Sequence, residues 1–412
     1  MKSGNIVTVL DIGSTKVCCC IASVFADGKF SILGIGYCQC VGVKSGVIVD
    51  MESVEKSMVR AIESAENAAN CRVKSVYVSI SGKNVKSKIV NVSTKISGKI
   101  VTNDDINKML GALEAHSEEV EIVHAIPITF NIDSSYGITD PVGMVGSQLS
   151  MSINLVTAPR GQLNNLLVCV AKYHLKPIGV AAAGYASGLC MNSGDRTLST
   201  EIIVDFGGGT TSIAFFYDGV LCGCETIPLG GQHITKDIAL GLGISIGSAE
   251  RVKTLHGSAF ASVEDISDMV LVPVVEGDNI VDLQQVSKSA LNNIIQSRAE
   301  EILCAIREKI SSSIFKKDFA KSPLVITGGG SQLPGIRELT VDILARKVSL
   351  KKLSSVQVNS DIVVENDFAT AFGIVKFAQM SDASSLTRAA KLKSSEKNNI
   401  FKKALLWIEN NL

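Results

Sequence analysis

The chain has 412 residues, of which 46% are hydrophobic and 5% aromatic, and its 40 basic and 40 acidic residues give a formal net charge of zero. This length is enough for about two to four domains with a sizeable core. The balanced charge, with no basic stripe interleaved with aromatic residues, argues against nucleic acid as a partner.

The N-terminus leads directly into a predicted strand, Ile6 to Leu10, so we expect no signal peptide. We expect no transmembrane helix either, because the longest uncharged stretch, Pro141 to Pro159, is broken by Pro, Gly and polar residues. The next predicted strand contains three consecutive cysteines, Cys18, Cys19 and Cys20. The total of 11 cysteines is odd and includes no Cys-x-x-Cys pair, which favours buried thiols in a reducing compartment over a metal or disulfide framework.

A strand that ends in an Asp-x-Gly turn occurs twice. Ile6 to Leu10 runs into Asp11-Ile12-Gly13-Ser14-Thr15-Lys16, and Ile202 to Val204 runs into Asp205-Phe206-Gly207-Gly208-Gly209-Thr210. A second strand and then an Asp-Gly hairpin pair, Asp27-Gly28 or Asp218-Gly219, follow each turn. Each half of the chain is therefore predicted to begin with the same β-meander.

Two such loops facing each other could hold a polyphosphate, because glycines let backbone N–H groups approach an anion and hydroxyls add donors. The candidate phosphate-binding residues are Gly13, Ser14, Thr15, Lys16, Gly207, Gly208, Gly209, Thr210 and Thr211. Asp11 and Asp205 open the loops and are candidates both for holding Mg²⁺, through water, and for a catalytic role. The alternative for either loop alone is a plain hairpin.

Further along the first half, Asp50 is a predicted cap for a helix from Met51 to about Asn70, and a strand follows from Ser75 to Ile80. The pattern of predicted elements then changes between residues 84 and 161. Predicted strands at 88–94, 122–132 and 150–157, with a helix at 104–116, indicate a small inserted α+β module. A structural spacer is the alternative.

The chain returns to the first domain through a predicted helix, Gln162 to His174, and a strand, Pro177 to Ala182. A helix from Ala183 to Cys190 is expected to cross between the halves. In the second half, helices are predicted at 233–242 and 248–256, a strand at 269–275, and a long helix from Val281 to about Ile310.

A third glycine turn, Gly328-Gly329-Gly330-Ser331, follows the strand Leu324 to Thr327 and leads into a helix, which suits close approach to a nucleotide. At the end of the chain, residues 381–398 have the composition of a flexible linker. Residues 399–412 form an amphipathic helix when placed on a helical wheel.

This terminal helix is predicted to lie on an anionic membrane surface, because so short a helix is marginal alone in water and carries lysines beside an apolar face. The predicted membrane contacts are Phe401, Lys402, Lys403, Leu405, Trp407, Ile408 and Leu412. The alternative is docking on the protein's own surface or on a partner.

Two Asp-x-Gly loops half a chain apart, with a late Thr-Gly-Gly-Gly loop, resemble the superfamily of actin, heat-shock chaperones and sugar kinases. Within it, the chain resembles the FtsA family of bacterial cell-division proteins. The stretches that carry this resemblance are Ser81-Gly82-Lys83, His124-Ala125-Ile126-Pro127, Asp140-Pro141-Val142-Gly143, Val204 to Thr210 and Val325 to Gly329. The position of the insertion in the first half also favours this family over actin-like filament proteins and sugar kinases.

The resemblance implies an α/β, actin-like two-lobed ATPase fold, with duplicated mixed-sheet domains and an inserted α+β subdomain in the first half. Lobe 1 is then expected at 1–83 and 162–200, with the FtsA-type insertion at 84–161 and a closing segment at 361–380. Lobe 2 is expected at 201–242 and 306–360, the latter with the adenosine loop Gly328 to Gly330, and its small subdomain at 243–305. The linker 381–398 and the membrane helix 399–412 follow.

The resemblance also implies ATP with Mg²⁺ in the interlobe cleft and a protein that assembles with itself. It would anchor the FtsZ ring to the cytoplasmic face of the inner membrane at the division site, as a peripheral protein, and recruit later division proteins through the insertion. The small subdomain would dock the FtsZ C-terminal tail with Arg298, beside which Lys288 offers a second cation on the predicted long helix. Ordinary surface charge is the alternative for both.

No strong general base is evident in the sequence, so we expect at most a weak ATPase in which nucleotide selects a lobe arrangement. Glu301 is an alternative contact for the ribose. The competing functions are a pilus-assembly actin homologue and a small-molecule kinase with the same phosphate loops. A chaperone ATPase would need a large peptide-binding domain after the actin fold, and the sequence ends too soon for one.

Overall fold

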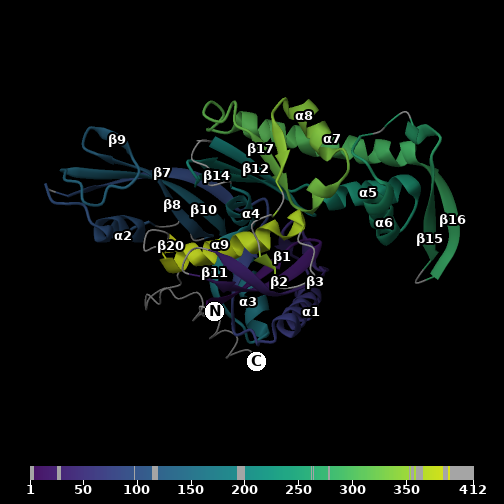
Figure 1. Ribbon diagram of the computed structural model, residues 1–412, viewed down its shortest axis with the longest axis horizontal. Helices are drawn as coiled ribbons and strands as arrows, with labels where there is room; N and C mark the ends of the chain where they lie inside the picture. The colour runs from purple at the N-terminus through teal and green to yellow at the C-terminus, as the bar shows by residue number, and fades with distance from the viewer. Residues whose placement is uncertain are drawn as a thin grey trace.

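The repeated strand-turn-strand pattern builds two sheets that lie on either side of a pair of helices (Figure 1). The computed structural model describes residues 4–25, 29–96, 98–113, 119–192, 200–260, 262, 264–276, 279–351, 353, 357–358, 365–383 and 388–389. Among the helices in these ranges, none has the length and apolar composition needed to span a membrane.

The first sheet has the strand order β11-β6-β1-β2-β3-β19. Its antiparallel meander is formed by β1 (Asn5–Ile12), β2 (Lys16–Val24) and β3 (Phe30–Gln39). β6 (Ser75–Ile80) pairs in parallel with β1, β11 (Lys176–Ala182) pairs in parallel with β6, and the short β19 (Gln357–Val358) pairs in parallel with β3. β4 (Val43–Lys44) and β5 (Val47–Ile48) form a separate antiparallel hairpin. The three consecutive cysteines of β2 are all buried with free thiols, as predicted.

The helix α1 (Met51–Ala69) packs on β2 and β3 through its apolar stripe, which includes Val54, Met58 and Ile62. Its first turn is capped by the Asp50 carboxylate, which accepts a hydrogen bond of 3.3 Å from the Ser53 N–H, as the sequence predicts. The helix α3 (Arg160–Lys172) packs beside α1 and carries the chain into β11.

The second sheet repeats the meander, with the order β14-β13-β12-β17-β18. Its strands are β12 (Thr200–Phe206), β13 (Thr211–Tyr217), β14 (Val220–Ile227), β17 (Leu324–Thr327) and β18 (Val348–Leu350). The predicted hairpin pair Asp218-Gly219 has φ of 46° and 80°, which is typical of a tight hairpin turn. The equivalent pair in the first half, Asp27-Gly28, lies outside the described residues.

Two helices fill the space between the sheets. α4 (Ala183–Met191) contacts β12 and β13 of the second sheet, α9 (Ala369–Ala383) contacts β1, β2 and β6 of the first, and the two helices pack on each other. On the outer side of the second sheet, α5 (Gly231–Leu242), α7 (Lys288–Ser312) and α8 (Ile336–Leu344) form a layer.

The insertion forms a third sheet with its own core, including Ile106, Phe130 and Leu149. Its order is β20-β8-β10-β7, from β20 (Arg388–Ala389), β8 (Val120–Ile132), β10 (Gln148–Pro159) and β7 (Lys86–Lys95), with β9 (Ser135–Ile138) paired to β8. The helix α2 (Asn103–Gly111) is shorter than predicted, and residues 114–118 lie outside the described residues. α9 runs to Ala383 and β20 follows, so both enter the predicted linker 381–398.

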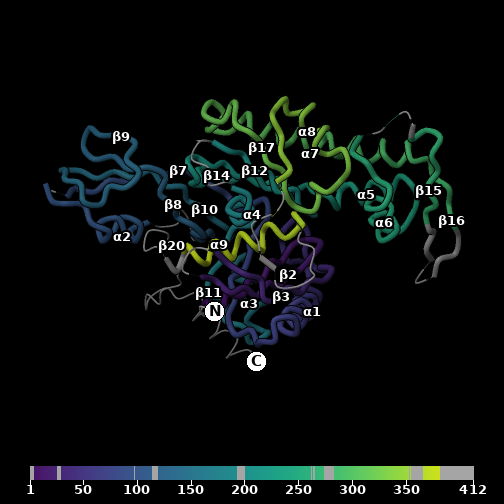
Figure 2. The backbone as a smooth tube through the Cα atoms, viewed as in Figure 1, coloured from purple at the N-terminus to yellow at the C-terminus, as the bar shows by residue number. Residues whose placement is uncertain are grey.

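The second lobe carries a small subdomain on the side opposite to the insertion (Figure 2). It contains α6 (Ile246–His256), a short η1 (Glu264–Ile266), and a hairpin of β15 (Met269–Glu276) and β16 (Asn279–Ser287). The long helix predicted from Val281 is wrong at its start, because residues 281–287 belong to β16 and α7 begins at Lys288. A short apolar run fits either period, and here pairing with β15 decides for the strand.

Candidate functional site

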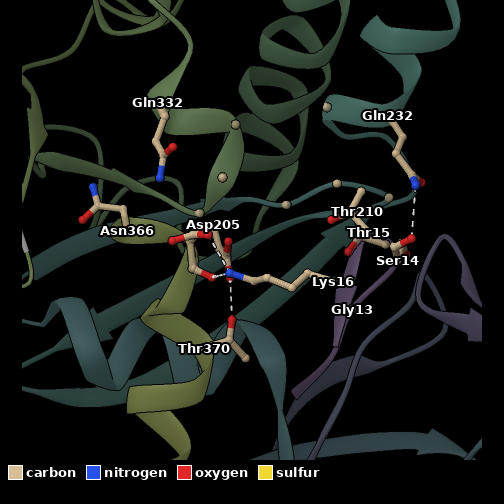
Figure 3. Close-up of a pocket in the computed structure, with 18 of the residues that line it drawn as sticks. Gly13, Ser14, Thr15, Lys16, Asp205, Thr210, Gln232, Gln332, Asn366 and Thr370 are labelled. Carbon is tan, nitrogen blue, oxygen red and sulfur yellow. Dashed lines mark hydrogen bonds and ion pairs between the residues drawn. The ribbon is translucent and has the colours of Figure 1, made fainter. Parts of the chain in front are cut away.

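A cavity of about 440 Å³ lies between the lobes, lined by all three glycine loops (Figure 3). This volume is in the range of small-molecule and cofactor sites. Further lining residues come from α5, α6 and the start of α9, so the cavity is formed by both halves of the chain.

The two Asp-x-Gly loops have the same hydrogen-bonded turn. The Gly13 N–H donates to the Lys16 carbonyl at 2.9 Å, and the Gly207 N–H donates to the Thr210 carbonyl at 3.1 Å. The loops also touch each other, since a Cβ added at Gly209 would lie 2.3 Å from the Ser14 hydroxyl oxygen. Glycine is therefore required at Gly209 by close approach of the opposite loop.

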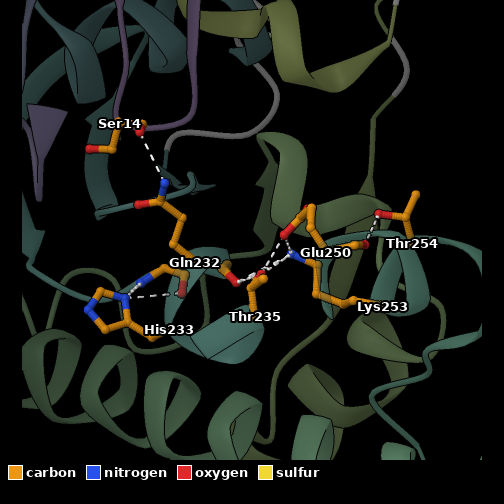
Figure 4. A network of polar contacts seen from close by, with 9 residues as sticks. Ser14, Gln232, His233, Thr235, Glu250, Lys253 and Thr254 are labelled. Atoms are coloured by element: carbon orange, nitrogen blue, oxygen red, sulfur yellow. Dashed lines mark hydrogen bonds and ion pairs between the residues drawn. The ribbon is translucent and has the colours of Figure 1, made fainter. Parts of the chain in front are cut away.

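The start of α5 holds the two loops in register (Figure 4). The Gly231 and Gln232 N–H groups donate to the carbonyls of Gly207 and Gly208 at 2.9 and 2.8 Å. The Gln232 side-chain amide then donates to the Ser14 carbonyl of the first loop at 3.1 Å. Gln232 thus bridges the second loop and the first loop, although Ser14 of the first loop is 218 residues away from it in sequence.

Asp11 stands at the end of β1, where the Ser79 hydroxyl donates to its carboxylate at 2.7 Å. Burial raises the pKa of this carboxyl, and the hydrogen bond from Ser79 and the positive charge of Lys16 offset part of that rise. A carboxylate in this position favours a neighbouring cation, because a cation would lower the cost of its ionised form.

Asp205 is the corresponding carboxylate at the end of β12 and accepts a hydrogen bond of 3.1 Å from the Thr370 hydroxyl. Burial raises the pKa of Asp205 to about 6, and the hydrogen bonds from Ser187 and Thr370 lower it, while the negative charge of Asp11 adds to the rise. The two acids therefore face the same cavity and oppose each other's ionisation. Among the described residues, no three acidic, histidine or cysteine side chains gather closely enough to hold a metal by themselves.

Lys16 extends from the first loop toward the side of the cavity where Asp205 and Thr370 lie (Figure 3). Its ammonium group forms an ion pair of 2.6 Å with the Asp367 carboxylate and donates to the Asp367 backbone carbonyl at 3.0 Å. It also lies over the Phe368 ring at 3.7 Å from the centroid. The lysine of the first loop is thus held by the short η3 helix (Asn366–Phe368).

The third loop follows β17 and meets the second. Gly328 has φ of 84°, and a Cβ there would lie 2.3 Å from an Asp205 carboxylate oxygen. The next residues form η2 (Gly329–Gln332), and Gln332, Leu333 and Pro334 also line the cavity. The loop therefore offers backbone surface to the cavity where a side chain would collide with Asp205.

A polar network on α5 and α6 forms another part of the wall (Figure 4). The Lys253 ammonium, only 14% exposed, contacts the Glu250 carboxylate at 2.7 Å and the Thr235 hydroxyl at 2.8 Å. The Thr235 hydroxyl also contacts Glu250. The sequence does not predict this charged pair, because its residues carry no local motif and only the fold brings α6 to the loops.

The structure brings most predicted site residues to this cavity. The lining includes Asp11, Gly13, Ser14, Thr15, Lys16, Asp205, Gly207, Gly208, Gly209, Thr210, Gly328, Gly329 and Gly330. Thr211 does not line it, since its buried hydroxyl donates to the Leu229 carbonyl at 2.9 Å. Lining residues that the sequence does not predict include Gln232, Glu250, Lys253, Gln332, Asn366, Asp367 and Thr370.

The predicted partner-binding cations lie away from the cavity and are paired internally. Arg298 contacts the Asp237 carboxylate at 2.5 Å and also the Glu301 carboxylate. Lys288 contacts Asp265 at 3.0 Å and Asp268 at 3.8 Å. Glu301 does not line the cavity, so the alternative contact with a ribose has no geometric support. The predicted membrane residues, 399–412, lie outside the described residues.

Two family models match the chain. Residues 202–373 match the model described as cell division protein FtsA, and residues 82–157 match the SHS2 domain inserted in FtsA. The second match falls on the sheet formed by β7, β8 and β10.

Curated relatives match over nearly the whole chain. The cell division protein FtsA of Agrobacterium fabrum is 37% identical over 92% of this chain and 88% of its own length. The FtsA proteins of Pseudomonas aeruginosa and Escherichia coli K12 are each 29% identical, the first over 100% of this chain and 99% of its own, the second over 98% and 97%.

Solved structures with low sequence identity share the fold. A PilM–PilN type IV pilus biogenesis complex aligns with a TM-score of 0.61 at 14% identity, covering 89% of this chain and 96% of that chain. MreB5 of Spiroplasma citri, bound to AMPPNP, aligns with a TM-score of 0.54 at 13% identity, covering 92% and 97%. These likenesses establish the actin-like α/β architecture that the sequence predicted.

Proposed function

The chain belongs to the FtsA family of cell division proteins, and from that premise we propose that it binds ATP with Mg²⁺ in the cavity between its three glycine loops. The observation that carries this proposal is the convergence of the three loops on one cavity of about 440 Å³. Each loop alone is an ordinary turn, but together they supply backbone donors from both halves of the chain.

The residues present fit a nucleotide. The hydroxyls of Ser14, Thr15 and Thr210 and the ammonium of Lys16 would contact the phosphates, since all four residues line the cavity. The backbone of Gly328 to Gly330 would approach the adenosine, where a side chain at Gly328 would collide with Asp205. Lys253 and Glu250 on α6 also line the cavity and would contact the polar edge of the nucleoside.

The residues also fit Mg²⁺ held through water. Asp11 and Asp205 both carry a raised pKa and face the same cavity, so a hydrated cation between them would relieve the cost of their ionisation. When bound, the ion would neutralise phosphate charge. We propose that turnover is slow and that nucleotide occupancy mainly selects a lobe arrangement, with Asp11 and Asp205 as the candidate catalytic groups.

We further propose that the chain assembles with itself end to end. The insertion and the β15–β16 hairpin lie at opposite ends of the longest axis, which Figure 1 shows horizontally, and both carry exposed apolar side chains. Ile100, Tyr136 and Val145 are 59%, 79% and 62% exposed on the insertion. Met269, Leu271 and Leu283 are 56%, 56% and 55% exposed on the β15–β16 hairpin. Apolar surface at opposite ends is what a repeating contact between copies would bury.

The FtsZ C-terminal tail is the proposed partner of the small subdomain, residues 243–305, through Arg298 and Lys288. Because Arg298 is paired with Asp237 and Lys288 with Asp265, an acidic tail would have to compete with those carboxylates. The exposed apolar face of the β15–β16 hairpin lies in the same subdomain. The insertion, residues 84–161, is the proposed contact for other division proteins.

Membrane attachment is proposed for the amphipathic segment 399–412, reached through the linker 381–398. Together with FtsZ binding, this would place the protein on the cytoplasmic face of the inner membrane at the division site.

The proposed division of the rest of the chain is lobe 1 at 1–83, 162–200 and 361–380, and lobe 2 at 201–242 and 306–360.

Calorimetric titration with ATP and Mg²⁺ tests the nucleotide proposal. We expect one site, and about a tenfold loss of affinity in Lys253→Met, which removes a cation from the cavity wall. Lys309→Met is the matched control, because Lys309 is 46% exposed on α7 and does not line the cavity. Absence of both binding heat and a rise in melting temperature at millimolar ATP would overturn the proposal.

A further inference from the structure

The segment 365–370, which leads into α9, contacts all three glycine loops. The Asn366 carbonyl accepts a hydrogen bond of 3.2 Å from the Gly328 N–H of the third loop. The Thr370 hydroxyl donates to Asp205 at the second loop, and Asp367 binds Lys16 of the first. One short segment is therefore joined to every loop that lines the cavity.

Asp367 forms the ion pair of this segment, and only one of its two carboxylate oxygens has a hydrogen-bond partner within the described residues. One carboxylate oxygen, Oδ2, accepts from the Lys16 ammonium at 2.6 Å. The other oxygen, Oδ1, is buried and has no hydrogen-bond partner within the described part of the chain. A buried carboxylate oxygen without a donor is costly, and the ion pair between Lys16 and the other oxygen offsets part of that cost.

The Lys16 side chain makes polar and ring contacts with this segment. Its side chain is 19% exposed, its ammonium also donates to the Asp367 backbone carbonyl at 3.0 Å, and it lies 3.7 Å from the centroid of the Phe368 ring. Among the described residues that line the cavity, the positive charges are Lys16 and Lys253, and Lys16 is the one that belongs to an Asp-x-Gly loop. A phosphate group that enters between the loops therefore meets a cation that is already neutralised.

We propose that Asp367 is a positioning residue that competes with the terminal phosphate of the nucleotide for Lys16, and thereby sets the preference between a nucleoside triphosphate and a diphosphate. This inference rests on the nucleotide binding proposed above. A ligand that draws Lys16 away leaves the partly buried Asp367 carboxylate, whose side chain is 29% exposed, without its counter-charge, which opposes binding. This cost of separating Lys16 from Asp367 is greatest for the triphosphate, because its additional phosphate carries the charge that competes for the ammonium group.

The test compares the dissociation constants of ADP and of a non-hydrolysable ATP analogue, each with Mg²⁺, in the full chain and in Asp367→Asn. The neutral amide keeps the shape of the side chain and releases Lys16. We expect affinity for the ATP analogue to rise more than affinity for ADP, so that the ratio of the two constants shifts by about tenfold toward the triphosphate. Asp367→Glu retains the charge and should keep the ratio of the unsubstituted chain.

Asp342→Asn is the matched control, because Asp342 is an exposed acid on α8 that does not line the cavity. If Asp367→Asn does not fold, as judged by its melting transition, Asp367→Ser provides a second neutral variant. An unchanged ratio in a folded neutral variant, or a shift toward ADP, would overturn the inference while leaving nucleotide binding intact. Failure of the unsubstituted chain to bind either nucleotide would instead overturn the proposed function.

Discussion

The side-chain amide of Asn154 on β10 donates a hydrogen bond of 3.2 Å to the backbone carbonyl of Leu221 on β14. Asn154 is completely buried, and its own amide oxygen accepts from the Ser87 hydroxyl on β7. Since β14 is the edge strand of the second sheet, this contact joins the insertion to the second lobe, although in sequence the insertion interrupts the first lobe. The base of the insertion is thus a link between the lobes.

Replacing Asn154 with leucine should destabilise the protein by about 1–3 kcal/mol, because the Leu221 carbonyl and the Ser87 hydroxyl lose a buried partner. Urea unfolding measures this loss. Asn91→Leu is the control, since Asn91 is exposed on β7 and its contact with Ser152 lies at the surface. A loss for Asn154→Leu no larger than that of the control would show that the contact does not support the junction.

Asp205→Asn should abolish binding of ATP with Mg²⁺ and, in the nucleotide-free protein, raise stability at pH 7.5. The pKa of Asp205 is raised from 3.8 to about 6, so the folded state binds the proton more tightly than the unfolded state does. Its contribution to stability is therefore greatest below about pH 4 and is lost as the pH rises toward 6 and above. The amide variant avoids that loss, which is worth about 1–3 kcal/mol.

Urea unfolding of Asp205→Asn and of the unsubstituted chain at pH 5 and pH 7.5 checks this sign. The advantage of the variant should be larger at pH 7.5, and Asp342→Asn should show no comparable pH dependence. An advantage that grows as the pH falls would contradict the raised pKa.

His124 on β8 should make the protein sensitive to mild acid. Its Nε2 accepts from the Ala182 N–H at 2.9 Å, its ring packs on Tyr185 and Phe377, and burial lowers its pKa from 6.5 to about 3. The unfolded chain therefore gains a proton below about pH 6.5 that the folded chain excludes. Stability should fall by about 2 kcal/mol from this group between pH 7 and pH 5.

The difference in unfolding free energy between those two pH values measures the effect. It should shrink by about that amount in His124→Gln, a variant whose side chain does not titrate and can still accept from Ala182. His256→Asn, at an exposed histidine on α6, is the control. An unaltered difference in His124→Gln would show that His124 is not the group responsible.

Gly209→Ala should weaken nucleotide binding by about tenfold or more, because the added Cβ would lie 2.3 Å from the Ser14 hydroxyl oxygen and force the two loops apart. Titration with ATP and Mg²⁺ gives the change in affinity. Gly161→Ala on α3 is the matched control, since a Cβ there meets nothing within 4 Å and alanine favours a helix. Equal affinities in the two variants would mean that close approach of the loops is unimportant for binding.

The sequence was informative wherever structure follows from local chemistry. The two Asp-x-Gly turns, the capped helix α1 and the strand β6 are each determined by residues that lie next to one another. Thr211 shows a limit of that approach, because adjacent residues entering a strand face opposite sides, and its hydroxyl turns away from the cavity that Thr210 lines.

Contacts between distant segments could not be predicted in this way. Lys16 and Asp367 are 351 residues apart, and nothing near either residue specifies the other. The wall formed by Glu250 and Lys253 depends on how α6 is placed against α5, which is a matter of tertiary packing. The sequence predicts a helix from Val281, where the structure has β16, because only pairing with the strand β15 fixes the conformation of that segment.

Flotation of FtsZ with anionic vesicles shows whether this chain joins FtsZ to a membrane. FtsZ, the full chain and ATP with Mg²⁺ are mixed with the vesicles, in parallel with the chain truncated after Lys397 and with Trp407→Glu. We expect FtsZ to float only when the intact chain is present, and both variants to lose this effect. If the intact chain and FtsZ both stay at the bottom of the gradient, this chain does not tether FtsZ to the membrane.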